Sequence, residues 1–516
     1  MRGRKGGGGR RRPRPTFRST IGRARATRHI TLPPARGARL LDEHRSSRRT
    51  VAGDLRPGSR TRCAPCTGPG LVVGSHADGE RTELGREPGK YVTRRVGVRL
   101  KILICLHDYL PYHKGGSEIH AHQTGAELAR RGHDVTALFT ERDLSSEEGS
   151  VRRGLLDGVK TIEVVHQREY ADVRETWEER PSLEILSSLL DVQRPDVVHF
   201  HHLASWGSGA VGVAHEAGAR VLVTLHDYHL ICDAATLLRP DGELCEEGLQ
   251  GRCTECIRRH PLLPERYGPG AEGMDEDALY AQAVRERFEK HRQDLRLADR
   301  VLSPSHFLAD VFSRAGFFAK EDCEVLKAGY PGPLHPARSH VRKGAFRVGY
   351  VGGIYPPKGV HVLVRAFQHL ADVHAELHVF GHLDWFPDYV EKLERDAGEG
   401  PIFFHGHFEP TEIDEVLGDL DCLVVPSVWY ENMPITVHEA YRNGLPVIAT
   451  DLGGMRECVQ DGVSGLLFTR GDEEALARAI RRLVSEPGLY ARLSHGRPVV
   501  PTLGQVVDRL EGLYRG

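Results

Sequence analysis

The sequence lacks both a marked net charge and a long run of apolar residues. Its 70 lysines and arginines are balanced by 71 aspartates and glutamates, which gives a net charge of −1. This balance gives no reason to expect a nucleic acid as a partner. No apolar run approaches the roughly 18 residues that a membrane-spanning helix needs, and the first hundred residues contain no apolar segment typical of a signal peptide. Neither a transmembrane helix nor a secretory signal is therefore expected.

Cysteine is also scarce. Ten cysteines in 516 residues do not make a disulfide scaffold, and the composition favours a cytoplasmic enzyme with reduced thiols. The chain is long for one hydrophobic core, so it predicts two α/β domains with additional segments.

Residues 1–97 lack the apolar periodicity of a folded domain. The segment begins MRGRKGGGGRRRPRPTFRST and stays rich in Arg, Gly and Pro, a composition that cannot bury enough surface to fold. It predicts a disordered basic tail. One explanation is an arm that binds anionic lipid or nucleic acid, and the other is a mis-assigned start of the reading frame, with true initiation near Val96 or Val98.

Residues 426–444 (PSVWYENMPITVHEAYRNG) are the most informative stretch. The apolar run at 421–425 predicts a buried parallel strand just before them. A loop with Glu431 and Asn432 follows, and Pro434 stands where a helix would begin, which is a favoured position for proline. The N–H groups of that first turn are then free to face a ligand, and the helix dipole favours an anion there.

Glu431 and Glu439 are separated by seven residues. One is expected on the loop and the other inside the helix, so both could face one crevice. Two carboxylates beside an anion-binding helix terminus suit a ligand with many hydroxyls and a phosphate, such as a nucleotide sugar. The alternative is a surface helix with two solvated glutamates.

With its neighbours, this stretch resembles the donor-binding motif of the retaining glycosyltransferases of family 4. The resemblance rests on strand, PS, ENMP, helix and then NGLPVIATDLGGMRE. It implies an α/β protein of the GT-B fold, with two facing Rossmann-like domains and the active site in the cleft between them. The implied boundaries are an acceptor-side domain at 98–332, a nucleotide-sugar domain at 345–495, and a C-terminal helix at 496–516 that returns to the first domain.

A double glycine, Gly115 and Gly116, follows the expected strand 100–106 and precedes a helix of about 15 residues. Glycines at such a turn let the backbone approach a pyrophosphate closely. The pattern is not G-x-G-x-x-G, and alone it would be an ordinary turn. Because EIH and RRGHDVT follow, it resembles the family's first loop, which faces the donor diphosphate and lines the acceptor site.

Histidines follow two further expected strands. His199, His201 and His202 invite a metal interpretation, but adjacent residues of an extended chain point to opposite faces, which argues against it. His226 and Asp227 stand at the carboxyl end of the strand 220–224, where ligands of open α/β sheets bind. The resemblance implies that His226 contacts the transferred sugar. The alternative is a structural histidine paired with Asp227.

An insertion at residues 232–256 holds four cysteines with the spacing C-x12-C-x7-C-x2-C. The C-x2-C half is common in structural zinc sites, whereas the other spacings are not. The insertion therefore predicts either a structural zinc or four thiols in a loop. The residues are Cys232, Cys245, Cys253 and Cys256.

The second domain is expected to open with a strand at 346–351 and the turn GGIYPPKGV. Lys358 in this turn supplies a point charge for a diphosphate, and by resemblance it is the family's phosphate-binding lysine. The family's arginine, expected near Gly353, is missing here. The loop HGHF at 405–408, with Gly406, resembles the loop that receives the nucleotide base. By the same resemblance the donor site includes Asn432, Met433 and Pro434.

The resemblance implies transfer of a sugar from a nucleoside diphosphate to an acceptor hydroxyl with retention, in polysaccharide, glycolipid or other glycoconjugate synthesis. Glu439 would hold the ribose and Glu431 the sugar hydroxyls, with His226, Asp227 and Glu431 as the catalytic set. No metal is expected for catalysis. The expected acceptor is a saccharide or lipid-linked, with peripheral contact at the inner face of the membrane. The alternatives are a GT-B nucleotide-sugar epimerase and a catalytically silent nucleotide-sugar-binding subunit.

Overall fold

The computed structural model describes residues 82–87, 90–95, 98–167, 170, 174–246, 253–257, 275–338 and 344–516. The chain divides into two units, residues 1–76 and residues 77–516, and everything below concerns the second. Most of the predicted tail at 1–97 lies outside the described residues. Inside it, two short strands that the sequence analysis did not anticipate, β1 (Thr82–Glu87) and β2 (Lys90–Arg95), pair antiparallel.

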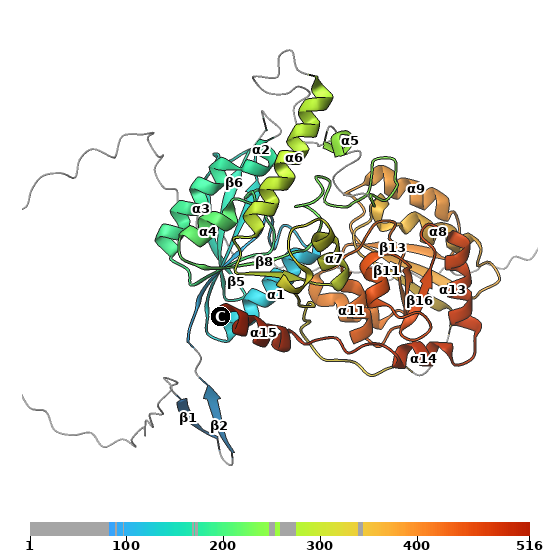
Figure 1. Ribbon diagram of the computed structural model, residues 1–516. Coiled ribbons are helices and arrows are strands. Elements are labelled where there is room, and N and C mark those ends of the chain that lie inside the picture. Colours follow the sequence, from blue (N-terminus) through green and yellow to red (C-terminus); the bar gives the residue numbers. More distant parts are fainter. Residues whose placement is uncertain are drawn as a thin grey trace, which may run out of the picture. The chain divides into compact units, whose positions relative to one another are not determined.

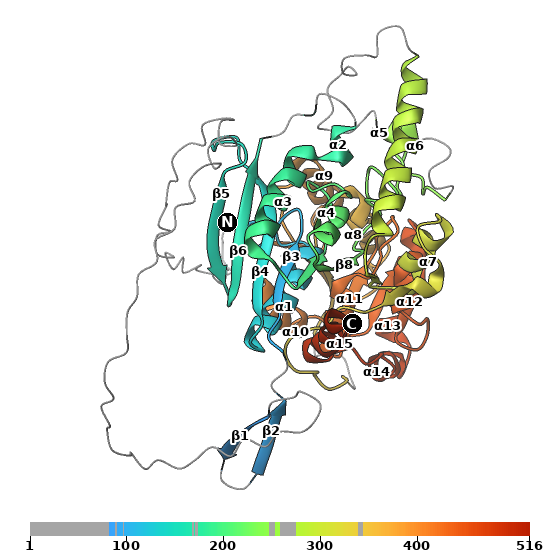
Figure 2. The same cartoon turned by 60° about the vertical axis from the view of Figure 1, so that its left-hand side comes forward.

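The first half of the unit contains an eight-stranded sheet in the order β10-β9-β8-β7-β3-β4-β6-β5. All neighbours are parallel except β5, which pairs antiparallel with β6 at one edge (Figure 2). The strands are β3 (Lys101–Cys105), β4 (Asp134–Arg142), β5 (Val151–Leu156), β6 (Val159–His166), β7 (Val197–Phe200), β8 (Arg220–Thr224), β9 (Arg300–Ser303) and β10 (Cys323–Val325).

The helices of this half connect successive strands, as parallel pairing requires. They are α1 (Gly116–Arg130), α2 (Glu175–Glu178), α3 (Arg180–Gln193), α4 (Ala210–Glu216), α5 (Cys253–Ile257), α6 (Glu276–Leu295) and α7 (His306–Arg314). A short 3-10 turn, η1 (Lys320–Asp322), precedes β10.

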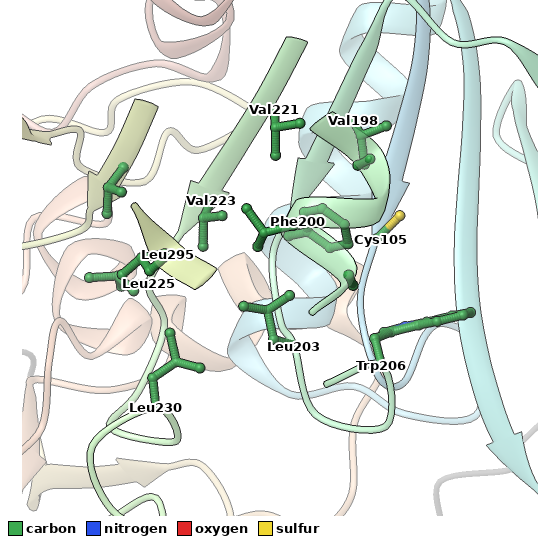
Figure 3. Close-up of a cluster of buried hydrophobic side chains, with 14 of the residues drawn as sticks. Cys105, Val198, Phe200, Leu203, Trp206, Val221, Val223, Leu225, Leu230 and Leu295 are labelled. Atoms are coloured by element: carbon green, nitrogen blue, oxygen red, sulfur yellow. The ribbon is translucent and has the colours of Figure 1, made fainter. Parts of the chain in front are cut away.

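The core of the first half lies between this sheet and its helices. Figure 3 shows strand residues such as Val198 and Val223 packed with Trp206 and with Leu295 of α6. The central strands are apolar on both faces, which explains their short continuous hydrophobic runs. Trp206 is fully buried, and its indole N–H donates to the carbonyl of Leu106 at 2.8 Å. This bond fixes the chain just after β3, at the edge of the site described below.

The second half contains a six-stranded parallel sheet in the order β13-β12-β11-β14-β15-β16, the doubly wound arrangement. The strands are β11 (Phe346–Val351), β12 (Ala375–Phe380), β13 (Ile402–Gly406), β14 (Cys422–Val425), β15 (Val447–Thr450) and β16 (Gly465–Phe468). The helices are α8 (Val360–Gln368), α9 (Pro387–Ala397), α10 (Ile413–Gly418), α11 (Ile435–Arg442), α12 (Gly453–Cys458), α13 (Glu473–Ser485) and α14 (Leu489–His495), with 3-10 turns η2 (Pro356–Lys358) and η3 (Pro410–Glu412).

The last helix, α15 (Leu503–Arg515), packs on the first half of the unit. Its Val507, Leu510 and Tyr514 join the core formed by β3, β4 and α1. Figure 1 shows α15 beside α1, and Arg131 at the end of α1 donates to Asp508 at 2.6 Å. The C-terminal helix therefore returns to the first sheet, as the GT-B resemblance implied. No helix in the described ranges is long and apolar enough to cross a membrane.

Candidate active site

A cavity of about 520 Å³ lies at the carboxyl ends of strands from both sheets. Its volume falls within the usual range of small-ligand sites, roughly 300–1,000 Å³. In the second sheet it sits at β11 and β14, where the strand order reverses, which is the expected ligand position of a doubly wound fold. The predicted site residues that line it are Gly115, Gly116, His226, Asp227, Lys358, Glu431, Asn432, Met433, Pro434 and Glu439. Gly406 does not line the cavity, whereas the next two residues, His407 and Phe408, do.

Glu431 is the most strongly held carboxylate of the cavity. Only 5% of its surface is exposed. Its Oε1 accepts from Lys358 Nζ at 2.7 Å, from Ser427 Oγ at 2.7 Å and from Trp429 Nε1 at 2.9 Å. These are the donors found among the described residues, and all three bond to this one oxygen. A buried carboxylate is stable only when donors or cations compensate its charge. These three donors hold the carboxylate of Glu431 in one orientation.

Lys358 lies in η2, directly before α8. Burial disfavours its charge, but the attraction of Glu431, helped by Tyr355, outweighs burial and raises the pKa of the Lys358 ammonium. The lysine therefore stays charged within the cavity, where Trp429 also lies 5.1 Å from its Nζ. A charged lysine paired with a buried carboxylate can bind a phosphate at the lysine and an adjacent hydroxyl at the carboxylate.

Helix α11 directs its N-terminus at the cavity. Pro434 occupies the N-cap position, directly before the first helical residue. No side chain forms a capping hydrogen bond with the free N–H groups of the first turn. Glu439 projects from the second turn and lines the same cavity. Burial, reinforced by Asp414 and opposed by Arg442, raises the pKa of Glu439 to about 7. The prediction that Glu431 and Glu439 face one crevice is confirmed.

Two glycines allow the close packing that positions the Glu431 loop. Gly359 has φ of +71°, and a Cβ there would lie 2.0 Å from the carbonyl oxygen of Pro426. A Cβ on Gly454, at the start of α12, would lie 1.8 Å from the carbonyl oxygen of Asn432. Since real Cβ atoms do not approach backbone oxygens so closely, larger residues would displace the loop.

The Glu431 loop contacts the loop that follows β8. Asn432 Nδ2 donates to the backbone carbonyl of His226 at 2.7 Å, and the Tyr228 hydroxyl donates to the carbonyl of Tyr430 at 3.2 Å. The residues predicted for the sugar site from the two halves of the chain are thus joined directly. No sequence pattern predicted these bonds.

His226 lies among other histidines rather than beside a carboxylate partner. Its Nε2 is 3.1 Å from Nδ1 of His201, and the rings of His201 and His120 lie around it. Burial, together with the nearby His120 and His202, lowers the pKa of His226 well below its usual value. The ring is therefore neutral and can donate or accept a hydrogen bond.

Asp227 pairs with His202 and not with His226. The two side chains are 2.9 Å apart and both are largely buried. Although burial opposes each charge, their mutual attraction raises the pKa of His202 and lowers that of Asp227. The alternative in which Asp227 is the structural partner of His226 is therefore wrong. Sequence adjacency favoured it, but the pair forms between β7 and β8, which are neighbours in the sheet.

Positive charges that the sequence analysis did not assign also reach the cavity. Lys114, just before the α1 N-terminus, lines it and forms an ion pair with Glu409 at 2.8 Å. Arg442 lines it from the end of α11. Since the family's arginine near Gly353 is missing, these groups and Lys358 are the cations of the described residues that face this space. The HKGG sequence at 113–116 was the available signal for Lys114.

The four cysteines of the insertion are free and interact with one another electrostatically. Burial raises the pKa of Cys253 to about 12, and the charges of Cys232, Cys245 and Cys256 each add to that rise. Burial and the charges of Cys232 and Cys245 raise the pKa of Cys256 to about 11. Among the described residues, the ligand atoms that converge closely enough to hold a metal ion are those of three histidines and not these four thiols. The zinc assignment therefore stays a prediction.

Two Rossmann-like sheets whose strand ends share one cavity form the GT-B fold. Among solved structures, an Anabaena protein, Alr3699/HepE in complex with UDP and glucose, matches with a TM-score of 0.52 at 16% identity, covering 81% of this chain and 100% of that one. At this identity the match concerns the fold alone.

Two family models match consecutive parts of the chain. Residues 114–331 match the model described as "Glycosyltransferase Family 4", and residues 345–486 match "Glycosyl transferases group 1". Together these matches span most of the described residues, and the chain belongs to the family 4 glycosyltransferases. It is a retaining glycosyltransferase that uses nucleoside-diphosphate sugar donors.

Curated relatives extend over nearly the whole folded part. Glycogen synthase of Mycobacterium tuberculosis is 24% identical over 413 residues, which are 76% of this chain and 88% of that protein. D-inositol 3-phosphate glycosyltransferase of Thermomonospora curvata is 27% identical over 429 residues, covering 78% and 90%. The two relatives differ in the product that their names imply, so they do not define the acceptor of this chain.

Proposed function

We propose that the cavity holds the nucleotide sugar with Glu439 at the ribose hydroxyls, Glu431 at the sugar hydroxyls, and Lys358 with the α11 N-terminus at the diphosphate. The observation that carries this assignment is the Lys358–Glu431 pair beside an uncapped helix N-terminus in one cavity. Both the helix dipole and the lysine favour an anion at this point. Oε2 of Glu431 is left to accept from a sugar hydroxyl.

The same groups act on the departing diphosphate. An oxocarbenium-like transition state places growing negative charge on that leaving group, and fixed positive charge lowers the barrier most where charge develops. The acceptor attacks from the face that the diphosphate leaves, so the phosphate oxygen can take the acceptor proton. The neutral His226 then orients the sugar by a hydrogen bond. Asp227 contributes by holding His202 in place beside this histidine.

The acceptor is a hydroxyl of a saccharide or of a lipid-linked glycan. It would approach from the α1 side, where Gly115, Gly116 and His120 line the cavity. The names of the relatives, a glycogen synthase and an inositol-phosphate glycosyltransferase, support a polyhydroxyl acceptor. The eight free cysteines of the described part are consistent with a reducing compartment. We propose work at the inner face of the membrane as the setting in which the acceptor would be lipid-linked.

The proposed function is tested by incubating the protein with radiolabelled UDP-, GDP- and ADP-sugars, with and without candidate acceptors. A transferase should hydrolyse one donor slowly without an acceptor and form a product with retained anomeric configuration when one is supplied. A C2-epimer of the donor would show the epimerase instead. Binding with no turnover under any acceptor would show a silent subunit.

We expect donor affinity to depend on pH through Glu439. An ionised carboxylate accepts ribose hydroxyls better than a protonated one, and the raised pKa of about 7 leaves much of it protonated in mildly acidic buffer. Affinity for the nucleotide sugar should therefore fall as the pH is lowered from about 8 to about 6, toward tenfold per unit below the pKa. Calorimetric titration across this range measures it.

The matched control is Glu439→Gln, which keeps size and hydrogen bonding but cannot ionise. It should bind at least tenfold more weakly at the higher pH and lose the pH dependence. The titrant is the intact nucleotide sugar, because a free nucleotide has a terminal phosphate that itself titrates near pH 6. Unchanged pH dependence in Glu439→Gln would contradict the ribose assignment.

For the insertion we propose a structural zinc held by Cys232, Cys245, Cys253 and Cys256. The C-x2-C spacing of Cys253 and Cys256 supports this proposal, and a bound metal would deprotonate thiols whose pKa values are raised mainly by burial. Protein purified without metal-affinity chromatography should contain about one thiolate-bound zinc per chain, and a chelator should loosen this loop but leave the sheets folded. Four freely alkylated thiols with no zinc would contradict the proposal.

A further inference from the structure

Three histidines from separate elements meet on the α1 side of the cavity. His120 lies on α1, His201 directly follows β7, and His226 lies two residues beyond the end of β8. Each can offer one ring nitrogen such that the three nitrogens lie within 4.8 Å of one another. His120 and His226 line the cavity, whereas His201 is fully buried behind them.

The spacing of the rings is that of ligands around one ion. The ring centroids are 5.5 Å apart for His120 and His201, 5.5 Å for His120 and His226, and 5.3 Å for His201 and His226. Tetrahedral zinc with Zn–N bonds of about 2.0–2.1 Å separates the centroids of two imidazole ligands by about 5 Å and their nitrogens by about 3.3 Å. Nδ1 of His201 and Nε2 of His226 lie 3.1 Å apart and form a hydrogen bond, which a metal ion bound to both nitrogens would replace.

The hydrogen bonding of these rings is incomplete within the described residues. Neither nitrogen of His120 has a hydrogen-bond partner, nor does Nε2 of His201, and all three atoms are buried. His120 is 9% exposed and His201 is not exposed. Buried polar atoms are nearly always paired, so unpaired ones at a cavity indicate a missing ligand.

Two neighbouring histidines, His199 and His202, do not share this property. His199 is bonded at both nitrogens, to the Tyr514 hydroxyl at 2.8 Å and to Thr224 Oγ1 at 2.7 Å. His202 is committed to Asp227.

We propose that His120, His201 and His226 bind one divalent transition-metal ion of the zinc type. Three imidazoles with a fourth position open to the cavity are the ligand set of an accessible zinc site rather than of a closed structural one. The open position takes water or a hydroxyl of a bound ligand. This site is distinct from the cysteine insertion and does not depend on the donor assignment, because binding is measured without substrates.

The test uses full-length protein carrying Cys253→Ser and Cys256→Ser, which removes the thiolate site from the measurement. Metal-free protein is titrated with Co²⁺ and then with Zn²⁺. Cobalt should give the visible absorption of a low-symmetry nitrogen site without the near-ultraviolet charge-transfer bands that thiolates produce. Zinc should displace it at one equivalent and raise the melting temperature, since a ligand of the native state stabilises it.

In that background, His120→Gln should lower Co²⁺ affinity by roughly a hundredfold or more, because even indirect supports of metal ligands are worth 10–100-fold. His122→Gln is the matched control. It makes the same change two positions along α1, at a histidine with its own partners, Tyr109 and Asp157, and should bind cobalt normally. His201→Gln is the second variant if His120→Gln folds poorly. The proposal would be overturned if His120→Gln and His201→Gln showed the same cobalt spectra, the same affinities and the same zinc-induced melting shifts as the parent protein.

Discussion

His226→Ala should transfer sugar at least a hundredfold more slowly while binding the nucleoside diphosphate almost normally. The ring is proposed to orient the sugar in the transition state, so its loss should lower kcat more than donor affinity. The substitution keeps the backbone carbonyl of residue 226, which accepts from Asn432 at 2.7 Å. The contact between the two loops should therefore survive, and the effect should be confined to the side chain.

Two companion variants show how His226 acts. Asp227→Asn breaks the ion pair with His202 and should cost less than His226→Ala, because Asp227 has no bond to His226. If His120→Gln is as slow as His226→Ala, the histidines of this cluster act as a unit. A nearly active His226→Ala enzyme would show that the sugar is oriented by another residue.

Lys358→Ala should lower donor affinity or turnover at least tenfold without unfolding the protein. The substitution removes a charge from the diphosphate site, and it also leaves the carboxylate of Glu431, 5% exposed, with only Ser427 and Trp429 as donors. An uncompensated buried carboxylate becomes protonated or moves. Both consequences weaken the site. Steady-state kinetics with the donor varied, together with the melting temperature, measures the effect.

The control for Lys358→Ala is Lys392→Ala, an exposed lysine on α9 outside the cavity. It should leave the kinetics unchanged. Lys358→Ala combined with Glu431→Gln should be less defective than the sum of the single changes, since the two residues act as a pair. Normal kinetics in Lys358→Ala would exclude Lys358 from the donor site.

The sequence predicted the second sheet well because its strands are short buried runs separated by turn residues. The strand expected at 346–351 agrees with β11. The sequence allowed three site residues to be grouped, namely Lys358, Glu431 and Glu439. Each follows a strand, and the carboxyl ends of parallel strands lie at the same edge of the sheet. The family's motif spacing then supplied their expected roles.

The first half was predicted less completely because its site depends on sheet order. The apolar pattern indicates strands at 197–200 and 220–224, but it does not show that the two strands are neighbours in the sheet. Their adjacency in the sheet creates the His202–Asp227 pair. The rule that adjacent residues of an extended chain face opposite ways argued only against a site made by His201 and His202 together, and these two bond to different partners. It could not show that His201 meets His120 and His226, which come from other elements.

The donor site itself is tested most directly by a thermal-shift panel of UDP, GDP, ADP and their sugars, with wild-type protein and Glu439→Ala. At least one nucleotide and its sugar should raise the melting temperature of the wild-type protein, because a ligand that binds only the native state stabilises it. The shift should be largely lost in Glu439→Ala, whose melting temperature without ligand should stay close to wild type. Equal shifts in both proteins, or none with any nucleotide, would contradict the assignment of this cavity to the donor.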